Sequence, residues 1–378
     1  MENYFRFIRF PELIIKVISK VLKYLSFNIW KLNMYNAMKY KAAIIGLGDI
    51  AYKIDTDLSR KTIWTHAKGF KTHKNIDLIA VSDIKESHYR DFNIYYKNIN
   101  YYKSYLEMLK NNKLDIISIC TPTNTHLKII KEIVCLKSFK AIFFEKPMGL
   151  DLKEAEEISA LCVNSGIVLA VNYMRRWENK YIYLKTIIDN KELGHLHSIT
   201  AYGSTALLTS TSHLIDLFLY YGGDFRWLVG SLQTEYVRKV HGYYDPGGYA
   251  FTRFSNGVFG FLKGVSKDPL HYMFEIDLLF SDARATLSSD GESFNLEKFT
   301  NSNSTSGAGY KVLEKVDLNQ SEFKKNERML DAISDILDCI NTKKLPKSNG
   351  LNAIKVHKFI QAIKDSNSQD NNKINYND

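Results

Sequence analysis

The chain has 378 residues, of which 45% are hydrophobic and 13% aromatic, so it is large and apolar enough for two globular domains and is not a disordered chain. A formal charge of +10 would suggest a nucleic-acid partner, but residues 1–41 hold eight Lys and Arg against two Glu, which places +6 of that charge at the start. The rest of the chain carries about +4, too little to predict binding to DNA or RNA.

Residues 1–38 are predicted to be an extension outside the domains. Apolar residues recur at helical spacing from Pro11 onward, with lysines between them, which predicts a basic amphipathic helix. We interpret residues 11–31 as a peripheral contact with anionic lipid. Two alternatives remain: a helix docked on the rest of the protein, or translated sequence upstream of a later initiating Met.

The cysteines and the hydropathy indicate the compartment. Cys120, Cys135, Cys162 and Cys339 are widely spaced and contain no C-x-x-C pair, so we expect buried thiols in a reducing environment. No run approaches the roughly 18 apolar residues that a membrane-spanning helix needs. No small-residue cleavage site follows the first apolar segment. These features predict a cytoplasmic protein.

The first predicted strand, residues 40–46, runs directly into the glycine turn G-L-G-D-I-A. In a G-x-G-x-x-A turn the first glycine permits the bend, the second leaves room for a pyrophosphate, and the alanine allows the following helix to pack closely. We therefore expect Gly46, Gly48, Asp49 and Ile50 to contact a dinucleotide at the N-terminus of a helix. Flavins and S-adenosylmethionine are bound by similar turns, so the turn alone does not name the cofactor.

An acidic residue follows the second predicted strand, residues 76–81. Asp83 stands where a carboxylate would bind the ribose hydroxyls of an adenosine, which favours NAD, with NADP as the alternative. It is separated from Gly46 by 37 residues, against roughly 20 in the usual motif. Residues 52–64 are therefore predicted to contain an insertion. The other interpretation of Asp83 is a helix N-cap before Glu86.

Three further apolar segments complete a predicted doubly wound parallel sheet. The strands are expected at residues 114–120, 139–145 and 166–171, with helices at residues 125–137 and 151–161. Together with the first two strands they predict a Rossmann dinucleotide-binding domain over residues 39–172.

The second half of the chain is predicted to form an α/β domain over residues 173–365 with a large, open, mostly antiparallel sheet. Helices are expected near residues 178–190, 323–340 and 351–363. Strands are expected at residues 195–203, 232–240, 248–254, 258–265, 273–280 and 283–287. The polar residues 366–378 are predicted to be a disordered tail.

Three polar segments follow buried strands, at the sheet edge where ligands of doubly wound folds bind. They are T-P-T-N-T-H at 121–126, E-K-P at 145–147 and N-Y-M-R-R-W at 172–177. A lysine that follows a buried strand and stands beside a carboxylate is partly desolvated, which makes its proton available for transfer. Lys146 is therefore the first candidate for a catalytic group. The sequence shows no metal-ligand cluster.

These elements, in this order, resemble the Gfo/Idh/MocA family of NAD(P)-dependent sugar oxidoreductases. The resemblance rests on G-L-G-D-I-A, C-T-P-T-N-T-H, F-F-E-K-P, V-N-Y-M-R-R-W and S-H-L-I-D, and it covers residues 39–223. It implies a Rossmann domain and a C-terminal α/β domain whose open sheet forms homo-oligomers. It also implies hydride transfer between a nicotinamide cofactor and a sugar, nucleotide-sugar or cyclitol.

The resemblance also assigns roles to individual residues. Lys146 would bind the reacting hydroxyl and assist its proton transfer, and His213 would be the partner acid or base at the substrate. The residues expected to line the cofactor are Thr121, Pro122, Asn124, His126, Glu145 and Lys146, and those expected near the substrate are Tyr173, Arg176 and His213.

One position departs from the family pattern. Many relatives have an aspartate four residues before the histidine, whereas this chain has Thr209. A threonine cannot accept a proton at neutral pH, so either His213 works without that acid or the chemistry is altered or lost. Y-K-I-D at 52–55 and T-H-A-K-G-F at 65–70 resemble members from bacterial surface-polysaccharide pathways, which suggests a nucleotide-linked sugar as substrate.

Other interpretations remain open at this point. By residue type alone, His213 could be a core histidine, Glu145 and Lys146 a solvated ion pair, and Arg175 and Arg176 surface charges. For the whole protein, one alternative is an NAD-retaining glycoside hydrolase of the same fold, which cleaves its substrate through transient oxidation. The other alternative is a non-catalytic nucleotide-binding protein.

Overall fold

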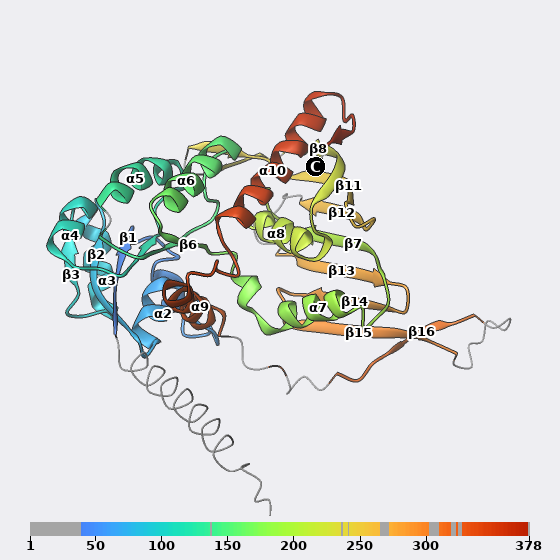
Figure 1. The fold of residues 1–378 in the computed structure, drawn as a ribbon, viewed down its shortest axis with the longest axis horizontal. Helices are drawn as coiled ribbons and strands as arrows, with labels where there is room; N and C mark the ends of the chain where they lie inside the picture. The colour runs from blue at the N-terminus through green and yellow to red at the C-terminus, as the bar shows by residue number, and fades with distance from the viewer. Residues whose placement is uncertain are drawn as a thin grey trace, which may run out of the picture.

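The computed structural model describes most of the chain after residue 38, in the ranges 39–136, 138–235, 237–240, 242–264, 272–301, 310–318, 323 and 327–376. The predicted extension with its amphipathic helix at 11–31 lies outside these ranges. Two large sheets organise the described residues, one on each side of the molecule in Figure 1. Within these ranges, none of the helices is both long and apolar enough to cross a membrane.

The first sheet has six parallel strands in the order β3-β2-β1-β4-β5-β6, which is the order of a Rossmann fold. The predicted doubly wound sheet is therefore confirmed, with β3 as an edge strand missing from the sequence prediction. The central strands are buried along nearly their whole length because helices cover both faces. The strands are β1 (Tyr40–Ile45), β2 (Ile76–Ser82), β3 (Asn100–Tyr102), β4 (Ile116–Ile119), β5 (Ala141–Phe144) and β6 (Val168–Val171).

The helices of this half follow the strands along the chain. α6 begins where an N-cap predicts it, because the carboxylate of Asp151 accepts the backbone N–H of Glu154. The α-helices are α2 (His66–Thr72), α3 (Glu86–Tyr95), α4 (Tyr105–Asn111), α5 (His126–Ile133) and α6 (Leu152–Asn164). The short 3-10 helices are η1 (Lys53–Thr56), η2 (Thr123–Thr125), η3 (Val134–Leu136) and η4 (Met174–Trp177).

One helix from the far end of the chain also covers the parallel sheet. α9 (Arg328–Thr342) lies beside α2, as Figure 1 shows, and Met329, Ile333 and Ile336 belong to the same core cluster as Phe70 of α2. Its apolar residues recur at helical spacing and face this sheet. The Rossmann layer thus includes a helix that the predicted boundary after residue 172 places in the second domain.

The second sheet has nine strands in the order β16-β15-β14-β13-β7-β12-β11-β8-β17, and confirms the predicted large, mostly antiparallel sheet. Of the pairs that the structure describes, β7 and β12 run parallel and the other neighbours antiparallel. The strands are β7 (Leu196–Gly203), β8 (Phe225–Leu232), β11 (Gly248–Phe254), β12 (Phe259–Gly264), β13 (Phe274–Phe280), β14 (Ala283–Ser288), β15 (Ser293–Thr300), β16 (Val312–Lys315) and β17 (Ile374–Asn375).

The strand predicted at 232–240 is wrong. β8 ends at Leu232, and the polar residues after it leave the sheet. The chain then forms a separate two-stranded sheet from β9 (Arg238–Val240) and β10 (Tyr243–Asp245). The sequence prediction ran across a boundary between two sheets, and it also missed β15 and β16.

One face of the second sheet is covered by helices and the other is open. Alternate residues of β11 and β12 are buried and exposed, as expected for strands with one covered face. The helices of this half are α7 (Asn179–Asn190), α8 (Thr211–Gly222) and α10 (Gly350–Ser368), and α8 and α10 pack on β7, β12, β8 and β11.

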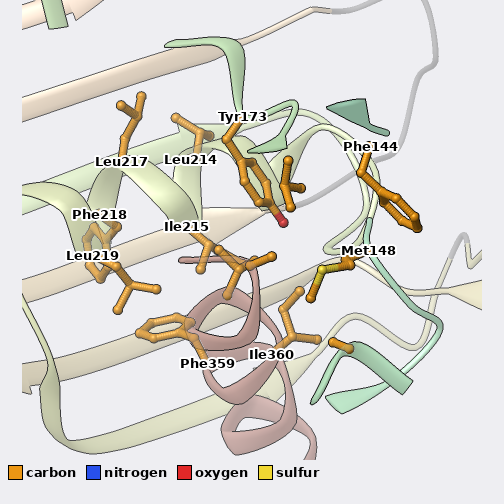
Figure 2. Close-up of a cluster of buried hydrophobic side chains, with 14 of the residues drawn as sticks. Phe144, Met148, Tyr173, Leu214, Ile215, Leu217, Phe218, Leu219, Phe359 and Ile360 are labelled. Carbon is orange, nitrogen blue, oxygen red and sulfur yellow. The ribbon is translucent and has the colours of Figure 1, made fainter. Parts of the chain in front are cut away.

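The two halves share one continuous core. Figure 2 shows Phe144, Met148 and Tyr173 from the Rossmann side next to the apolar face of α8, with Phe359 and Ile360 of α10 closing the cluster. All of these side chains are at most 2% exposed. Because this apolar surface is buried against both sheets, the residues at the end of β5 and those on α8 are held in a fixed relation.

The predicted disordered tail at 366–378 is wrong for the residues that the structure describes. α10 continues to Ser368, and Ile374 and Asn375 form β17, which pairs with β8. Tyr376 packs edge-on against Phe225 with ring centroids 4.6 Å apart. Two apolar side chains in a polar tail are therefore enough to add an edge strand.

Candidate active site

The ends of five parallel strands meet at one edge of the first sheet. Ile45 of β1 pairs with Ser82 and with Ile119, Ile119 pairs with Phe144, and Phe144 pairs with Val171. Strands that end in register bring the next residue of each strand to the same edge. These next residues are Gly46, Asp83, Cys120, Glu145 and Asn172.

The backbone and its neighbours require glycine at one of the two glycine positions of the turn but not at the other. Gly46 has a φ of +90°, and a Cβ there would lie 2.8–2.9 Å from Thr121 and Cys120. A Cβ on Gly48 would meet a single atom, the Cys120 carbonyl oxygen at 3.9 Å, which is an ordinary contact. The fold itself therefore requires Gly46 but not Gly48. The open space over Gly48 fits a pyrophosphate that approaches the backbone.

The helix expected directly after the glycine turn does not begin there. Residues 48–52 form turns that lead into η1, and α2 begins at His66. The helix start nevertheless returns to the turn, because His66 N donates to Ile50 O at 3.3 Å and Ala67 N donates to Ala51 O at 2.8 Å. The predicted insertion thus separates the glycine turn from its helix, and Ala51 stays fully buried between them.

Asp83 fixes the glycine turn from the neighbouring strand. Its carboxylate accepts the backbone N–H of Leu47 at 2.8 Å and that of Lys85 at 2.8 Å, and His88 Nδ1 lies 3.2 Å from Oδ2. Lys85, not Asp83, is the N-cap of α3. A carboxylate has roughly four acceptor positions, so Asp83 keeps capacity for a ribose hydroxyl beside the turn.

The loop after β4 is held from behind by a histidine. His126 is 1% exposed, with Nε2 2.9 Å from Thr121 O and Nδ1 3.3 Å from Met148 O. Burial lowers the pKa of His126, and the two carbonyl oxygens act in the opposite sense. The structure therefore places His126 between two loops, whereas Pro122 and Asn124 of the same segment are exposed.

A buried polar network lies under the Glu-Lys-Pro turn. Glu145 Oε1 is 2.8 Å from His66 Nε2 and accepts a hydrogen bond from Asn172 Nδ2 at 2.6 Å. The other ring nitrogen of His66 is 2.8 Å from Ser118 Oγ on β4. Burial raises the pKa of Glu145, but the hydrogen bonds and charges of His66, with Asn172 and Lys146, outweigh it and the pKa lies below its ordinary value. Glu145 is thus a satisfied, buried carboxylate.

Lys146 contacts the second half of the chain. It is half-buried, and its ammonium donates to the backbone oxygen of Thr209 at 3.1 Å. Thr209 precedes α8, the helix that carries His213 in its first turn. The solvated surface ion pair considered for Glu145 and Lys146 is therefore wrong, since Glu145 is buried and Lys146 is bonded to another element.

His213 is buried but lies among polar groups. Its ring is 5.6 Å from the ring of Tyr173 in an edge-on contact, and its Nδ1 has no hydrogen-bond partner in the part of the chain that the structure describes. Burial, followed by the charges of Lys146, Arg175 and Arg328, holds the pKa of His213 well below its ordinary range. The imidazole is therefore neutral at neutral pH.

The arginine beside His213 is Arg175, not Arg176. Arg176 is 7% exposed, is hydrogen-bonded through Nε to both oxygens of Asp216, and lies 4.5 Å above the ring of Tyr220. Arg176 was expected near the substrate, and the structure shows it in a buried ion pair with Asp216. Arg175 donates to Asp290 at 2.7 Å and contributes to the low pKa of His213.

Three functional candidates escaped the sequence analysis: His66, Arg175 and Asp245. His66 belongs to a segment noted for its resemblance to other sequences, but its partner Glu145 is 79 residues away. Asp245 binds the turn at 208–209 from 36–37 residues away. No local spacing signals such contacts. Of the four cysteines expected to be buried, Cys135 is exposed.

The glycine turn yields a prediction for cofactor binding. Replacing Gly48 with Val should weaken NAD binding by about 50-fold, because the new side chain fills the space over the turn, while the melting temperature stays within about 2 °C of wild type. Calorimetric titration with NAD and thermal unfolding measure the two effects. Gly46→Val is the comparison: its side chain meets Cys120 and Thr121 in the fold itself, so it should destabilise the protein. Equal NAD affinity in Gly48→Val and wild type would contradict this assignment.

The fold and this sheet edge define an NAD-binding protein of the Rossmann type. Residues 40–173 match the model of the oxidoreductase family with an NAD-binding Rossmann fold, named GFO_IDH_MocA. Over these residues the chain is similar to the Gfo/Idh/MocA oxidoreductases, the family that the sequence motifs resemble.

Two relatives and one solved structure illustrate the likeness. An uncharacterized oxidoreductase, YrbE, of Bacillus subtilis is 30% identical over 48% of this chain and 54% of its own length. The myo-inositol 2-dehydrogenase of Thermotoga maritima is 27% identical over 42% of this chain and 43% of its own length. The WlbA dehydrogenase of Bordetella pertussis, solved with NADH and UDP-GlcNAcA, has a TM-score of 0.69 at 16% identity and covers 90% of this chain and 99% of its own. The chain thus spans about half the length of the curated relatives it matches, and the structural likeness shows the fold.

Proposed function

We propose that this chain is an NAD-dependent oxidoreductase that acts on a secondary hydroxyl of a sugar or cyclitol ring. The observation that carries the proposal is the pairing of Lys146 with the turn before His213, at the same sheet edge as the glycine turn. The acid at Asp83 favours NAD over NADP because it would meet a 2′-phosphate with a like charge.

The chemistry divides between cofactor and protein. Bound NAD would supply a hydride acceptor for the carbinol carbon, and the protein would supply a base for the hydroxyl proton as the carbonyl forms. We assign that proton to the imidazole of His213, whose buried Nδ1 has no hydrogen-bond partner in the described part of the chain. The ammonium of Lys146 is suited to bind the reacting oxygen as its charge changes. Thr209 supplies its backbone oxygen to Lys146, and its hydroxyl donates to the backbone oxygen of Ala206 at 3.2 Å.

A nucleotide-linked sugar is the substrate class we favour. The WlbA dehydrogenase was solved with UDP-GlcNAcA, and inositol dehydrogenases are among the relatives. A cavity of about 740 Å³, large enough for part of a ligand beyond one sugar ring, is lined by Lys61, Lys180 and Glu178 among others. Glu178 is paired with Arg328, whose charge also acts on His213. Lys146 and His213 themselves do not line it.

The test is the formation of NADH by the purified chain with UDP-GlcNAcA and, separately, with myo-inositol. We expect NADH in proportion to the oxidised sugar. Release of a sugar without net NADH would favour the NAD-retaining hydrolase. Two results together would favour the non-catalytic protein. The chain would bind NAD without turning over either substrate, and the Lys146→Met variant would replace the wild type in the cell without loss of function.

We further propose that the open face of the second sheet joins two copies of the chain. Trp227, Phe251, Phe259 and Phe261 form one aromatic group there, with Phe251 stacked on Phe261 at a centroid distance of 4.9 Å. Phe251 is 37% and Phe261 42% exposed. Adjacent exposed aromatic side chains on a sheet face are typical of a protein–protein interface.

The oligomer proposal predicts the effect of one charge. Phe261→Glu should convert the wild-type oligomer to monomers in light-scattering chromatography, because burying an unpaired carboxylate at an apolar interface is costly. Leu351→Glu, at an exposed position on α10, is the matched control and should leave the mass unchanged. A monomeric wild-type chain would overturn the proposal.

A further inference from the structure

Asp245 is a carboxylate from the small two-stranded sheet that enters the site without any sequence signal. It is the last residue of β10 and is 0% exposed. Its two oxygens bind successive backbone N–H groups: Oδ1 accepts from Leu208 at 2.9 Å and Oδ2 accepts from Thr209 at 3.0 Å. A carboxylate that accepts two adjacent amides fixes the orientation of that peptide unit.

The turn that Asp245 holds is the one that meets Lys146. The oxygen of Thr209 accepts the Lys146 ammonium at 3.1 Å and the Ser212 hydroxyl at 2.6 Å. His213 follows this turn in the first turn of α8, and its backbone N–H donates to Ser210 O at 3.1 Å. A displacement of the turn would therefore move the acceptor of Lys146 and the base candidate His213 together.

Asp245 also acts on Lys146 by charge. Burial raises the pKa of Asp245, while hydrogen bonds from Leu208 and Thr209 and the charge of Lys146 act in the opposite sense. The titratable groups on which the charge of Lys146 acts include Glu145 at the end of β5, His213 on α8 and Asp245 on β10. Glu145 is already bonded to His66 and Asn172, whereas Asp245 belongs to the second half of the chain and holds the turn that Lys146 contacts.

We propose that Asp245 is a positioning residue of the active site, which holds the 208–209 turn so that Thr209 orients the Lys146 ammonium, and which serves as a counter-charge to that ammonium. This inference rests on the proposed function of Lys146. It also explains how the site could work with Thr209 in place of the aspartate found in many relatives. The negative charge would come from Asp245 on β10.

The test measures Lys146 directly and requires neither cofactor nor sugar. Competitive acetylation of the full chain with acetic anhydride, followed by mass spectrometry, gives the labelling of Lys146 as a function of pH, with the exposed Lys358 on α10 as internal reference. Asp245→Asn is the informative variant, because its amide can accept only one of the two N–H groups and carries no charge. We expect the midpoint of the Lys146 curve to fall by about one pH unit, since a nearby opposite charge favours the ammonium form.

Asp115→Asn is the matched control. Asp115 also accepts one backbone N–H, that of Lys41 at 3.0 Å, and one lysine ammonium, that of Lys140 at 2.8 Å, but it precedes β4 and so lies at the opposite edge of the sheet. It should leave the Lys146 curve unchanged. A Lys146 curve in Asp245→Asn that coincides with wild type would overturn the inference.

If Asp245→Asn does not fold, Asp245→Glu is measured in the same way. Asp245→Glu keeps the charge, but its longer side chain displaces the turn. The labelling rate of Lys146 should therefore change at least about threefold, while the midpoint of its pH curve stays near wild type. An unchanged rate would overturn the inference. A chain that binds no NAD would refute the proposed function and leave this labelling result intact, so the two failures are distinguishable.

Discussion

Lys146→Met is expected to lower kcat by about 10³-fold while the affinity for NAD changes by less than about threefold. The variant keeps most of the length and apolar stem of the side chain and removes the ammonium that the Thr209 oxygen orients. Loss of a positioned charge that acts on the reacting oxygen typically costs about 10²–10⁴-fold in rate, and 10³-fold corresponds to about 4 kcal/mol of transition-state stabilisation. Steady-state kinetics with the sugar that the wild type oxidises, and calorimetry with NAD, measure the two quantities.

The chain offers a matched control for this variant on the same strand. Lys140 precedes β5 and Lys146 follows it, so the two lysines lie at opposite ends of one short strand. Lys140 is about half exposed and pairs with Asp115 at 2.8 Å. Lys140→Met should leave kcat within about twofold of wild type. If Lys146→Met kept more than a tenth of the wild-type kcat, Lys146 would not be the catalytic group.

His66→Leu is expected to lower the free energy of unfolding by about 3 kcal/mol at pH 7, because it removes one of the two side chains that bond to the buried carboxylate of Glu145. The pKa of Glu145 lies below its ordinary value of 4.5 in the folded state. A depressed carboxyl pKa stabilises the protein fully above about pH 4.5, and this contribution is lost as the pH falls through the folded value. The difference between His66→Leu and wild type should therefore narrow below about pH 4.5.

Urea unfolding at pH 7 and at pH 4 measures this difference. His73→Leu, just after the last turn of the same helix, is the control: it removes a hydrogen bond of 3.1 Å to Ser334 in an exposed region. Its expected cost is about 1 kcal/mol or less. Equal destabilisation by the two substitutions would mean that the His66–Glu145 contact has no special weight in the fold.

The sequence predicted the parts of the fold that depend on local pattern. Strands such as β1 and β5 are continuous apolar runs because both of their faces are covered, and the turns that follow them carry Gly46 and Lys146. The parallel order then requires that these turns meet at one edge. β8 was missed because it starts only three residues after α8 ends at Gly222, while the predicted strand covered the polar residues beyond it.

The parts of the site that were missed depend on contacts between distant segments. The helix after the glycine turn is displaced to residue 66 by an insertion, and the backbone bonds from His66 and Ala67 restore its place. The choice between Arg175 and Arg176 depends on which side of η4 each faces, and the adjacent residues have the same chemistry. Asp245 lies on a strand of a separate small sheet, so its role depends on how that sheet packs.

A crystal structure of the chain with NAD tests the central claim most directly. We expect the pyrophosphate over Gly48, the adenosine ribose at Asp83, and the nicotinamide ring facing Lys146 and His213. A nicotinamide ring bound away from Lys146, or a pyrophosphate at any other turn, would contradict the account.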